Sequence, residues 1–203
     1  MKQAARHWER HLPEGKYGAH FFPEFETRAK AVSAEILRVK TPAEARDVLL
    51  DLMRSLEAKK AVAVRCPLQE KAGIPEALKS AGIQLFTERA DIAEHAATAD
   101  VGISGVEFAV AETGSVCQNA TAVEDRLVSM LPPVHVAFLD SSLVLPGIED
   151  AFEIFSKIFD RGYISFITGP SRTADIERVL TIGVHGPSRL ILIAVDEVDA
   201  GGR

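Results

Sequence analysis

Residues 189–195, with the sequence RLILIAV, decide the fold class of this 203-residue chain. Every position after Arg189 is apolar. A strand with one face in solvent alternates apolar and polar residues, so an unbroken apolar run is typical of a parallel strand that is covered on both faces. The run at 134–139 (VHVAFL) has a similar composition. We therefore expect both runs to lie inside a sheet.

Strand and helix patterns alternate along the chain on the amino-terminal side of these runs. Short apolar runs at 61–64 and 83–86 predict further strands. Helical spacing or capping signals predict helices that begin near Thr27, at Thr41-Pro42, at Ile74, at Asp91 and at Ile148. Strands that alternate with helices favour the α/β class, with a mostly parallel sheet flanked by helices on both faces.

Length and composition predict one domain with an added arm. With 47% hydrophobic residues, 203 residues can bury one substantial core. Residues 1–26 lack sustained periodicity but carry several aromatic residues, including Trp8, which are uncommon in disordered tails. We expect residues 1–26 to form an N-terminal helical arm that packs on its own domain or on a second subunit, as in a homo-oligomer. Residues 27–203 then form the α/β domain.

Charge and cysteine usage narrow the classes of partner. The formal net charge of -6 and the lack of a long basic run argue against nucleic acid. No apolar run approaches the roughly 20 residues that span a bilayer, and the first residues lack the apolar core of a secretory signal. Two cysteines, Cys66 and Cys117, are too few for a four-cysteine iron–sulfur cluster or structural zinc site. We expect a reduced, cytoplasmic protein without a metal site.

The stretch at 163–186, YISFITGPSRTADIERVLTIGVHG, is the first candidate ligand site. It predicts a strand, a turn at Gly169-Pro170 and a helix that begins near Ser171 or Thr173, either of which is a suitable N-cap. Free N–H groups at a helix start favour an anion, Arg172 offers a bidentate fork, and Gly169 allows close approach to the backbone. The alternative is a well-capped helix without a ligand.

The second candidate site is the turn at 112–115, Glu-Thr-Gly-Ser, which follows an apolar segment. A carboxylate at such a position in an α/β fold suits a general base or a nucleophile, so Glu112 is the candidate catalytic residue. In the alternative, Thr113 and Ser115 bond the backbone of a structural turn and Glu112 pairs with Arg126. Arg126 is also a candidate anion contact.

Four blocks of sequence together resemble a known family. They are AETGS at 111–115, Arg126 with SMLPP at 129–133, GPSRTADIE at 169–177 and GVHGP at 183–187. In order and spacing they are similar to the LUD domain of the lactate utilisation protein C family, over about residues 27–195. The resemblance implies a fold like that of ribose-phosphate isomerases and CoA transferases. It also implies a role in oxidising L-lactate to pyruvate with iron–sulfur lactate utilisation proteins as partners, and it assigns no cofactor to this chain.

Two functions stay open at this point. The chain is either a non-redox component of a lactate utilisation system or an independent enzyme on a phosphorylated or CoA-linked small molecule, with Glu112 as base or nucleophile. We expect the two candidate stretches to line one cleft at the carboxyl ends of adjacent strands. The candidate contacts to a small anionic ligand are Thr113, Gly114, Ser115, Arg126, Gly169, Ser171, Arg172, Thr173, His185 and Gly186.

Overall fold

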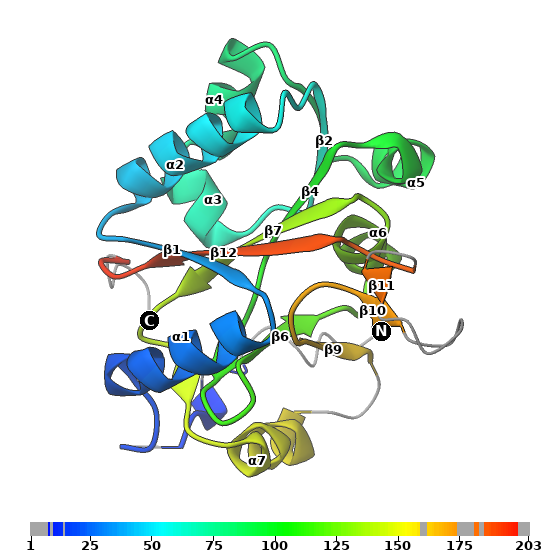
Figure 1. Cartoon of the computed structure of the whole chain (residues 1–203). Coiled ribbons are helices and arrows are strands. Elements are labelled where there is room, and N and C mark those ends of the chain that lie inside the picture. Colours follow the sequence, from blue (N-terminus) through cyan, green and yellow to red (C-terminus); the bar gives the residue numbers. More distant parts are fainter. Residues whose placement is uncertain are drawn as a thin grey trace.

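A six-stranded parallel sheet forms the centre of the protein (Figure 1). The structure is a computed structural model that describes residues 8, 10–13, 15–158, 162–173, 181–182 and 185–198. In spatial order the strands are β1 (Glu35–Val39), β12 (Arg189–Val195), β7 (Val134–Asp140), β4 (Val101–Gly105), β2 (Lys60–Ala63) and β3 (Gln84–Phe86). The predicted α/β class is confirmed, and the two apolar runs lie inside the sheet.

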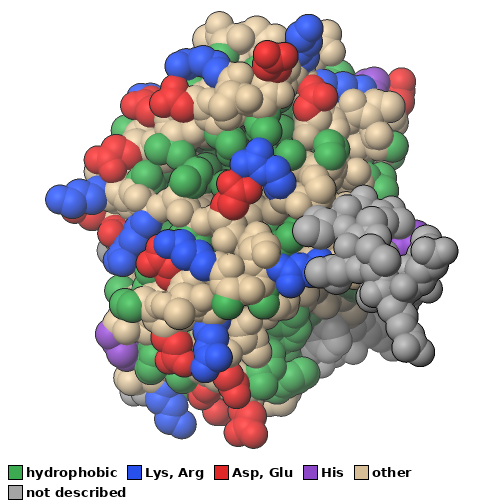
Figure 2. Space-filling model, in the orientation of Figure 1, with side chains coloured by type: hydrophobic (Ala, Val, Ile, Leu, Met, Phe, Trp, Pro, Cys, Tyr) green, Lys and Arg blue, Asp and Glu red, His purple; other side chains and the backbone are tan. Residues whose placement is uncertain are grey.

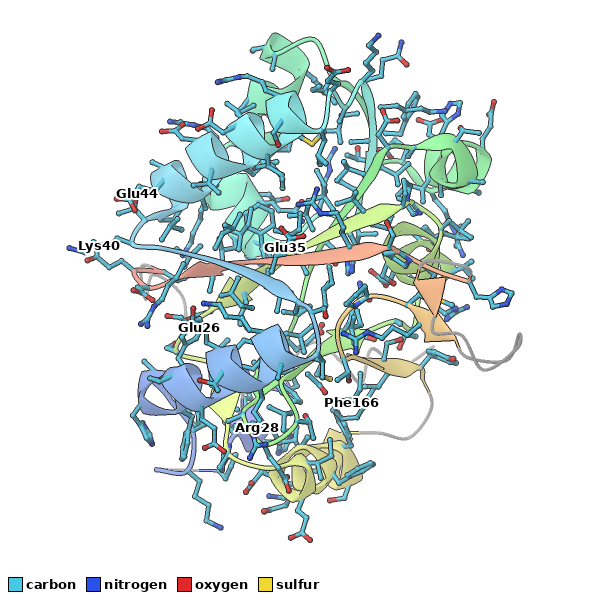
Figure 3. The ribbon with its side chains drawn as sticks, viewed as in Figure 1. Glu26, Arg28, Glu35, Lys40, Glu44 and Phe166 are labelled. Atoms are coloured by element: carbon cyan, nitrogen blue, oxygen red, sulfur yellow. The ribbon has the colours of Figure 1, made fainter. Side chains whose placement is uncertain are left out.

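Strand β12 shows why the run at 190–195 is apolar throughout. Ile191, Ile193 and Val195 pack into the core on one face of the sheet, and the alternate residues Leu190, Leu192 and Ala194 pack into the core on the other. All six are at most 2% exposed. At its first residue, β12 is tied to the edge strand by Arg189, whose guanidinium donates two hydrogen bonds of 2.7 and 2.8 Å to the carboxylate of Glu35 (Figure 3).

Three helices cover one face of the sheet (Figure 1). They are α2 (Pro42–Ser55), α3 (Pro67–Lys71) and α4 (Ile74–Ser80). Their largest fully buried contributions to this core are Leu49, Met53, Ile74 and Leu78. The predicted start of α2 is confirmed, because Thr41 is the N-cap and Pro42 is the first helical residue.

The other face is covered by α1 (Phe22–Ala31), by α5 (Arg89–His95), η3 (Ala96–Thr98) and α6 (Val123–Met130), and by a second sheet. This four-stranded sheet has the order β8 (Val144–Leu145), β5 (Phe108–Val110), β6 (Ser115–Asn119) and β9 (Ile164–Ile167). Its outer face packs on α7 (Ile148–Ile158). The sequence patterns predicted only its strand β9, at the start of the stretch 163–186. The remaining strands are short, and the strand pairs are antiparallel apart from β5–β8.

The first helix begins earlier in the chain than predicted. A short 3-10 turn, η2 (Ala19–Phe21), leads into α1, which begins at Phe22 and not near Thr27. Phe22 and Phe25 are fully buried. Trp8 packs against Phe108 of the second sheet, with 5.4 Å between ring centroids. This part of the arm therefore contacts its own domain.

The prediction of a helix that begins near Ser171 or Thr173 is wrong for its first residues. Residues Arg172–Thr173 form β10, which pairs antiparallel with β11 (Thr181–Ile182). Ser171 N donates a 2.8 Å hydrogen bond to Pro187 O, so the backbone that would have been free at a helix start is already paired. Residues 174–180, where the remainder of that helix was predicted, lie outside the described residues.

Acidic and basic side chains are interspersed on the face of the molecule in Figure 2. This face therefore carries no large basic patch of the kind that binds nucleic acid. Within the described ranges, no helix combines the length and the apolar character that crossing a membrane requires.

Candidate functional site

A cleft of about 320 Å³ opens at the carboxyl ends of β2, β4 and β7. Residues that directly follow these strands line it, among them Cys66, Glu107 and Asp140 itself at the end of β7. From β2 the chain goes to the edge strand β3, whereas from β4 it goes to β7 on the opposite side. Such a reversal of direction leaves a crevice where ligands of open α/β sheets bind. The cleft is therefore the candidate functional site.

Cys66 lies against the end of β4 because the neighbouring residue there is a glycine. A Cβ atom on Gly105 would lie 2.7 Å from Cys66 Cβ and 2.9 Å from its sulfur, closer than such atoms approach. Burial raises the pKa of the Cys66 thiol to about 11, and the negative charge of Glu107 acts in the same direction. The thiol is therefore protonated at neutral pH, which argues against a nucleophilic role.

Three carboxylates line the cleft, those of Glu107, Asp125 and Asp140, against the guanidinium of Arg65. Glu107 Oε2 accepts a 2.6 Å hydrogen bond from the backbone N–H of Asn119. Burial, with a smaller contribution from Glu124, raises the pKa of Asp125 to about 6. The described lining therefore combines three carboxyl groups with one guanidinium group.

Gln118 contributes a buried amide to the lining of the cleft. Its side chain is 2% exposed, and among the described residues neither Nε2 nor Oε1 has a hydrogen-bond partner. On β6 it lies two residues after Val116, so both side chains point to the same face, toward the layer between the two sheets. A buried amide without partners costs free energy, so this position calls for an explanation.

The two predicted site stretches do meet, but on α1 and away from the cleft. Ser115 Oγ lies 2.7 Å from Thr168 Oγ1. Gly114 and Gly169 both pack on the backbone of α1, where added Cβ atoms would lie 2.4 Å from Ala29 N and 2.2 Å from Val32 O. This is the carboxyl-terminal part of the helix, next to Arg28 (Figure 3). The two stretches follow the carboxyl ends of β5 and β9 in the second sheet, both of which pair with β6, but neither stretch lines the cleft described above.

Two of the charged candidates have structural partners at helix ends. Glu112 Oε2 accepts a 3.0 Å hydrogen bond from the backbone N–H of Ile148, the first residue of α7. Arg172 Nη2 donates to the carbonyl of Val32, the C-cap of α1. A carboxylate at a helix start and a guanidinium at a helix end both complement the helix dipole.

The remaining predicted residues are dispersed. Arg126 Nη1 donates a 2.5 Å hydrogen bond to Ala120 O, and its guanidinium lies 5.0 Å from the ring centre of Tyr163. Gly186 lies beside Ser171, just before the start of β12 and thus at the amino end of the sheet. His185 is exposed. The further candidates Thr113 and Thr173 lie in the turn before β6 and in β10.

Sequence analysis missed the residues of the cleft, although part of the signal was available. Cys66 follows the predicted strand at 61–64 within a few residues, and Asp140 follows the predicted run at 134–139 directly, whereas Glu107 follows β4, which was not predicted. Gln118 gave no such signal, because it lies on a strand that was not predicted. In the part of the chain that the structure describes, no group of three or more His, Cys, Asp or Glu side chains is arranged to hold a metal ion.

Known proteins resemble this chain in sequence and in fold. The LUD domain family matches residues 22–195. A protein named lactate utilization protein C from Anoxybacillus flavithermus is 30% identical over 157 residues, which are 76% of this chain and 71% of the relative. Its namesake from Halalkalibacterium halodurans is 29% identical over 154 residues, 72% of this chain and 67% of the relative.

A solved structure supports the fold. The crystal structure of a DUF162 family protein from Deinococcus radiodurans matches with a TM-score of 0.60, and the match covers 90% of this chain and 99% of that one. The two sequences are 19% identical, so this likeness concerns the fold alone.

Proposed function

The chain belongs to the LUD domain family, and we propose that it is a component of a lactate utilisation system. The names of the relatives from Anoxybacillus and Halalkalibacterium support this proposal. In the finer form of the proposal, the chain is the non-redox component. Iron–sulfur partner proteins then carry the electrons when L-lactate is converted to pyruvate.

The positions of the two cysteines support the assignment of the iron–sulfur centres to partner proteins. Cys66 lies in the cleft, and Cys117 lies on β6 in the core between the second sheet and α7. Burial raises the pKa of both thiols, and the thiolate is the form that binds iron. These 203 residues thus hold only two cysteines, both buried, which is too few for a four-cysteine cluster. This is the single observation that carries the finer proposal.

The observations favour this proposal over an independent enzyme that acts on phosphorylated or CoA-linked substrates. The described lining of the cleft contains a single basic side chain, that of Arg65, whereas phosphate sites commonly use several basic side chains. Glu112, the proposed base or nucleophile of that alternative, uses its carboxylate at the start of α7.

The first test is enzymatic. We expect the purified chain to show no oxidation of L-lactate with the acceptor dichlorophenolindophenol, because two electrons need a redox centre. Addition of iron–sulfur lactate utilisation proteins from the same organism should give turnover that depends on this chain. Turnover by the chain alone, or equal turnover of the partners without it, would contradict the proposal.

A genetic test separates the coarse proposal from the finer one. Deletion of the gene should abolish growth on L-lactate as the carbon source and leave growth on pyruvate unchanged. Normal growth of the deletion strain on L-lactate would contradict any role in lactate utilisation. A growth defect combined with turnover by the isolated chain would instead contradict only the assignment as a non-redox component.

A further inference from the structure

We propose that Gln118 recognises a small ligand in the cleft at the carboxyl ends of β2, β4 and β7, through a planar edge of the ligand that places an N–H donor beside an acceptor. Primary carboxamides and adenine both carry such an edge. This binding is independent of any role in lactate utilisation. Its basis is the unpartnered amide of Gln118, together with the mainly apolar walls of the cleft.

Gln118 differs from the carboxylates that line the same cleft. Asp140 Oδ1 accepts hydrogen bonds of 2.9 and 2.6 Å from the backbone N–H and the hydroxyl of Ser142, and Glu107 Oε2 accepts one from the backbone of Asn119. Gln118 is 2% exposed, and neither its Oε1 nor its Nε2 has a partner among the described residues. Within the described lining, its amide is therefore the buried group that a ligand can satisfy.

The amide of Gln118 determines which polar edge the ligand needs. The oxygen accepts a hydrogen bond and the nitrogen donates, and both atoms lie in one plane, so a ligand with a neighbouring donor and acceptor forms two parallel hydrogen bonds. Gln pairs with the edge of adenine in this bidentate manner. A metal ion offers neither a donor nor an acceptor, and a carboxylate group offers no donor. A ligand that pairs with both atoms recovers the free energy that is lost by burying this amide.

The walls of the cleft suit the apolar body of such a ligand. Trp8, Leu68, Val106 and Leu143 line it, and Trp8 and Leu68 are only 8% exposed. Small-molecule sites commonly combine apolar and aromatic walls with a few polar groups that fix the orientation of the ligand. The volume of about 320 Å³ limits the occupant to a small molecule or to one group of a larger one. An aromatic ring in the ligand can pack beside the indole of Trp8.

Trp8 also provides a signal from the cleft itself. It is the only tryptophan of the chain and it lines the cleft, so a single indole N–H resonance reports whether the cleft is occupied. The test follows this resonance by NMR while the isotope-labelled full chain is titrated at pH 7.5 with two pairs of uncharged probes. Benzamide is compared with acetophenone, and adenine with 6-methylpurine. In each pair a methyl group replaces the NH₂ group, so the shape is retained and the donor is lost.

We expect at least one NH₂ compound to shift the indole resonance and to bind at least ~10-fold more tightly than its methyl counterpart, because the methyl group leaves Gln118 Oε1 unpaired. Discrimination in the benzamide pair alone identifies a carboxamide ligand, and discrimination in the adenine pair alone identifies a nucleobase. Equal affinities within both pairs, or no shift of the indole resonance with either NH₂ compound, would overturn the proposal.

Substitution of Gln118 tests whether its amide is the group that discriminates. Gln118→Met removes both polar atoms and keeps a side chain of similar length. The NH₂ compound should bind about tenfold more weakly to this variant, so that the two members of a pair bind alike. The melting temperature of the free protein should stay the same or rise, because an unpartnered buried amide is removed. Unchanged discrimination, or a lower melting temperature, would show that the amide already has its partner within the fold, and the proposal would then fail.

Gln69→Met is the matched control. Gln69 on α3 is also 2% exposed, and its Nε2 has no partner among the described residues, but it does not belong to the described lining of the cleft. Discrimination within the probe pairs should survive this substitution. Its loss in Gln69→Met to the same extent as in Gln118→Met would assign the effect to general repacking of the core and not to recognition by Gln118.

Discussion

Gly73 and Gly114 have the same backbone conformation in different surroundings. Both have φ +65°, a value that an L-residue adopts at a cost of roughly 1–2 kcal/mol. A Cβ on Gly73 meets no atom within 4 Å, whereas a Cβ on Gly114 would overlap with the backbone of α1 at Arg28 and Ala29. A comparison of alanine substitutions at the two positions therefore separates the cost of backbone strain from the cost of a packing clash, because φ is the same at both.

We expect Gly73→Ala to lower the free energy of unfolding by ~1 kcal/mol and Gly114→Ala to lower it by about 3 kcal/mol more. Urea denaturation of both variants measures the difference. Equal losses would mean that the turn before β6 can move away from α1 without cost. In that case Gly114 would not be needed for the contact between the helix and the second sheet.

His135 on β7 makes the stability of the protein depend on pH. Its ring is fully buried, Nε2 lies 2.9 Å from Ser104 Oγ, and burial lowers the pKa of the imidazole to about 4. The unfolded chain, with a pKa near 6.5, binds the proton more readily than the folded protein. Stability is therefore fully present above pH 6.5 and is lost as the pH falls toward 4, by about 3 kcal/mol in total.

Urea titrations between pH 7.5 and 4.5 test this dependence. His135→Asn should flatten the loss of stability on acidification, although it lowers stability at pH 7.5. Ser104→Ala keeps the buried ring and should preserve the slope while it shifts the whole curve downward. A wild-type slope in His135→Asn would assign the acid sensitivity to other groups.

At the scale of single elements, the start of α2 was predictable because its signals are local. Thr41 Oγ1 accepts a 3.2 Å hydrogen bond from Glu44 N, and Pro42 occupies the first helical position, where no N–H is needed. Thr41→Ala should lower the free energy of unfolding by about 1 kcal/mol. Thr41→Ser keeps the hydroxyl and should cost only a small part of that. Equal losses in chemical denaturation would rule out the cap as the cause.

The second sheet, apart from its predicted strand β9, was not predictable, because its signals are not local. Strand β8 has two residues and β5 has three, too few for a period to be recognised. Their partners are fixed by distant segments, as in the pairing of β6 with β9. Distant segments also determine the structure at Arg172. Its backbone pairs with Ile182 in a strand, and its guanidinium donates to the carbonyl of Val32. These two interactions outweigh the local signals for a helix start.

For the whole molecule, sequence patterns were sufficient for the fold class but not for the site. An unbroken apolar run such as 190–195 indicates a strand that is buried on both faces, and this is enough to predict the type of sheet. The cleft depends on how β6 and α6 lie over the ends of β2 and β4, and this is a matter of tertiary packing. The blocks that resemble the LUD domain include Gly114, Gly169 and Arg172, which hold α1 in place. A recognisable block of sequence can therefore mark a scaffold as well as a ligand site.

The position of β12 has a consequence for biosynthesis. It follows every other described strand along the chain, yet it separates β1 from β7, and β1 has no other neighbour in the six-stranded sheet. While residues 189–195 are still untranslated, β1 has no neighbouring strand with which to pair. The nascent chain thus exposes apolar surface until residues 189–195 leave the exit tunnel, which makes it a natural client for chaperones that bind near that tunnel.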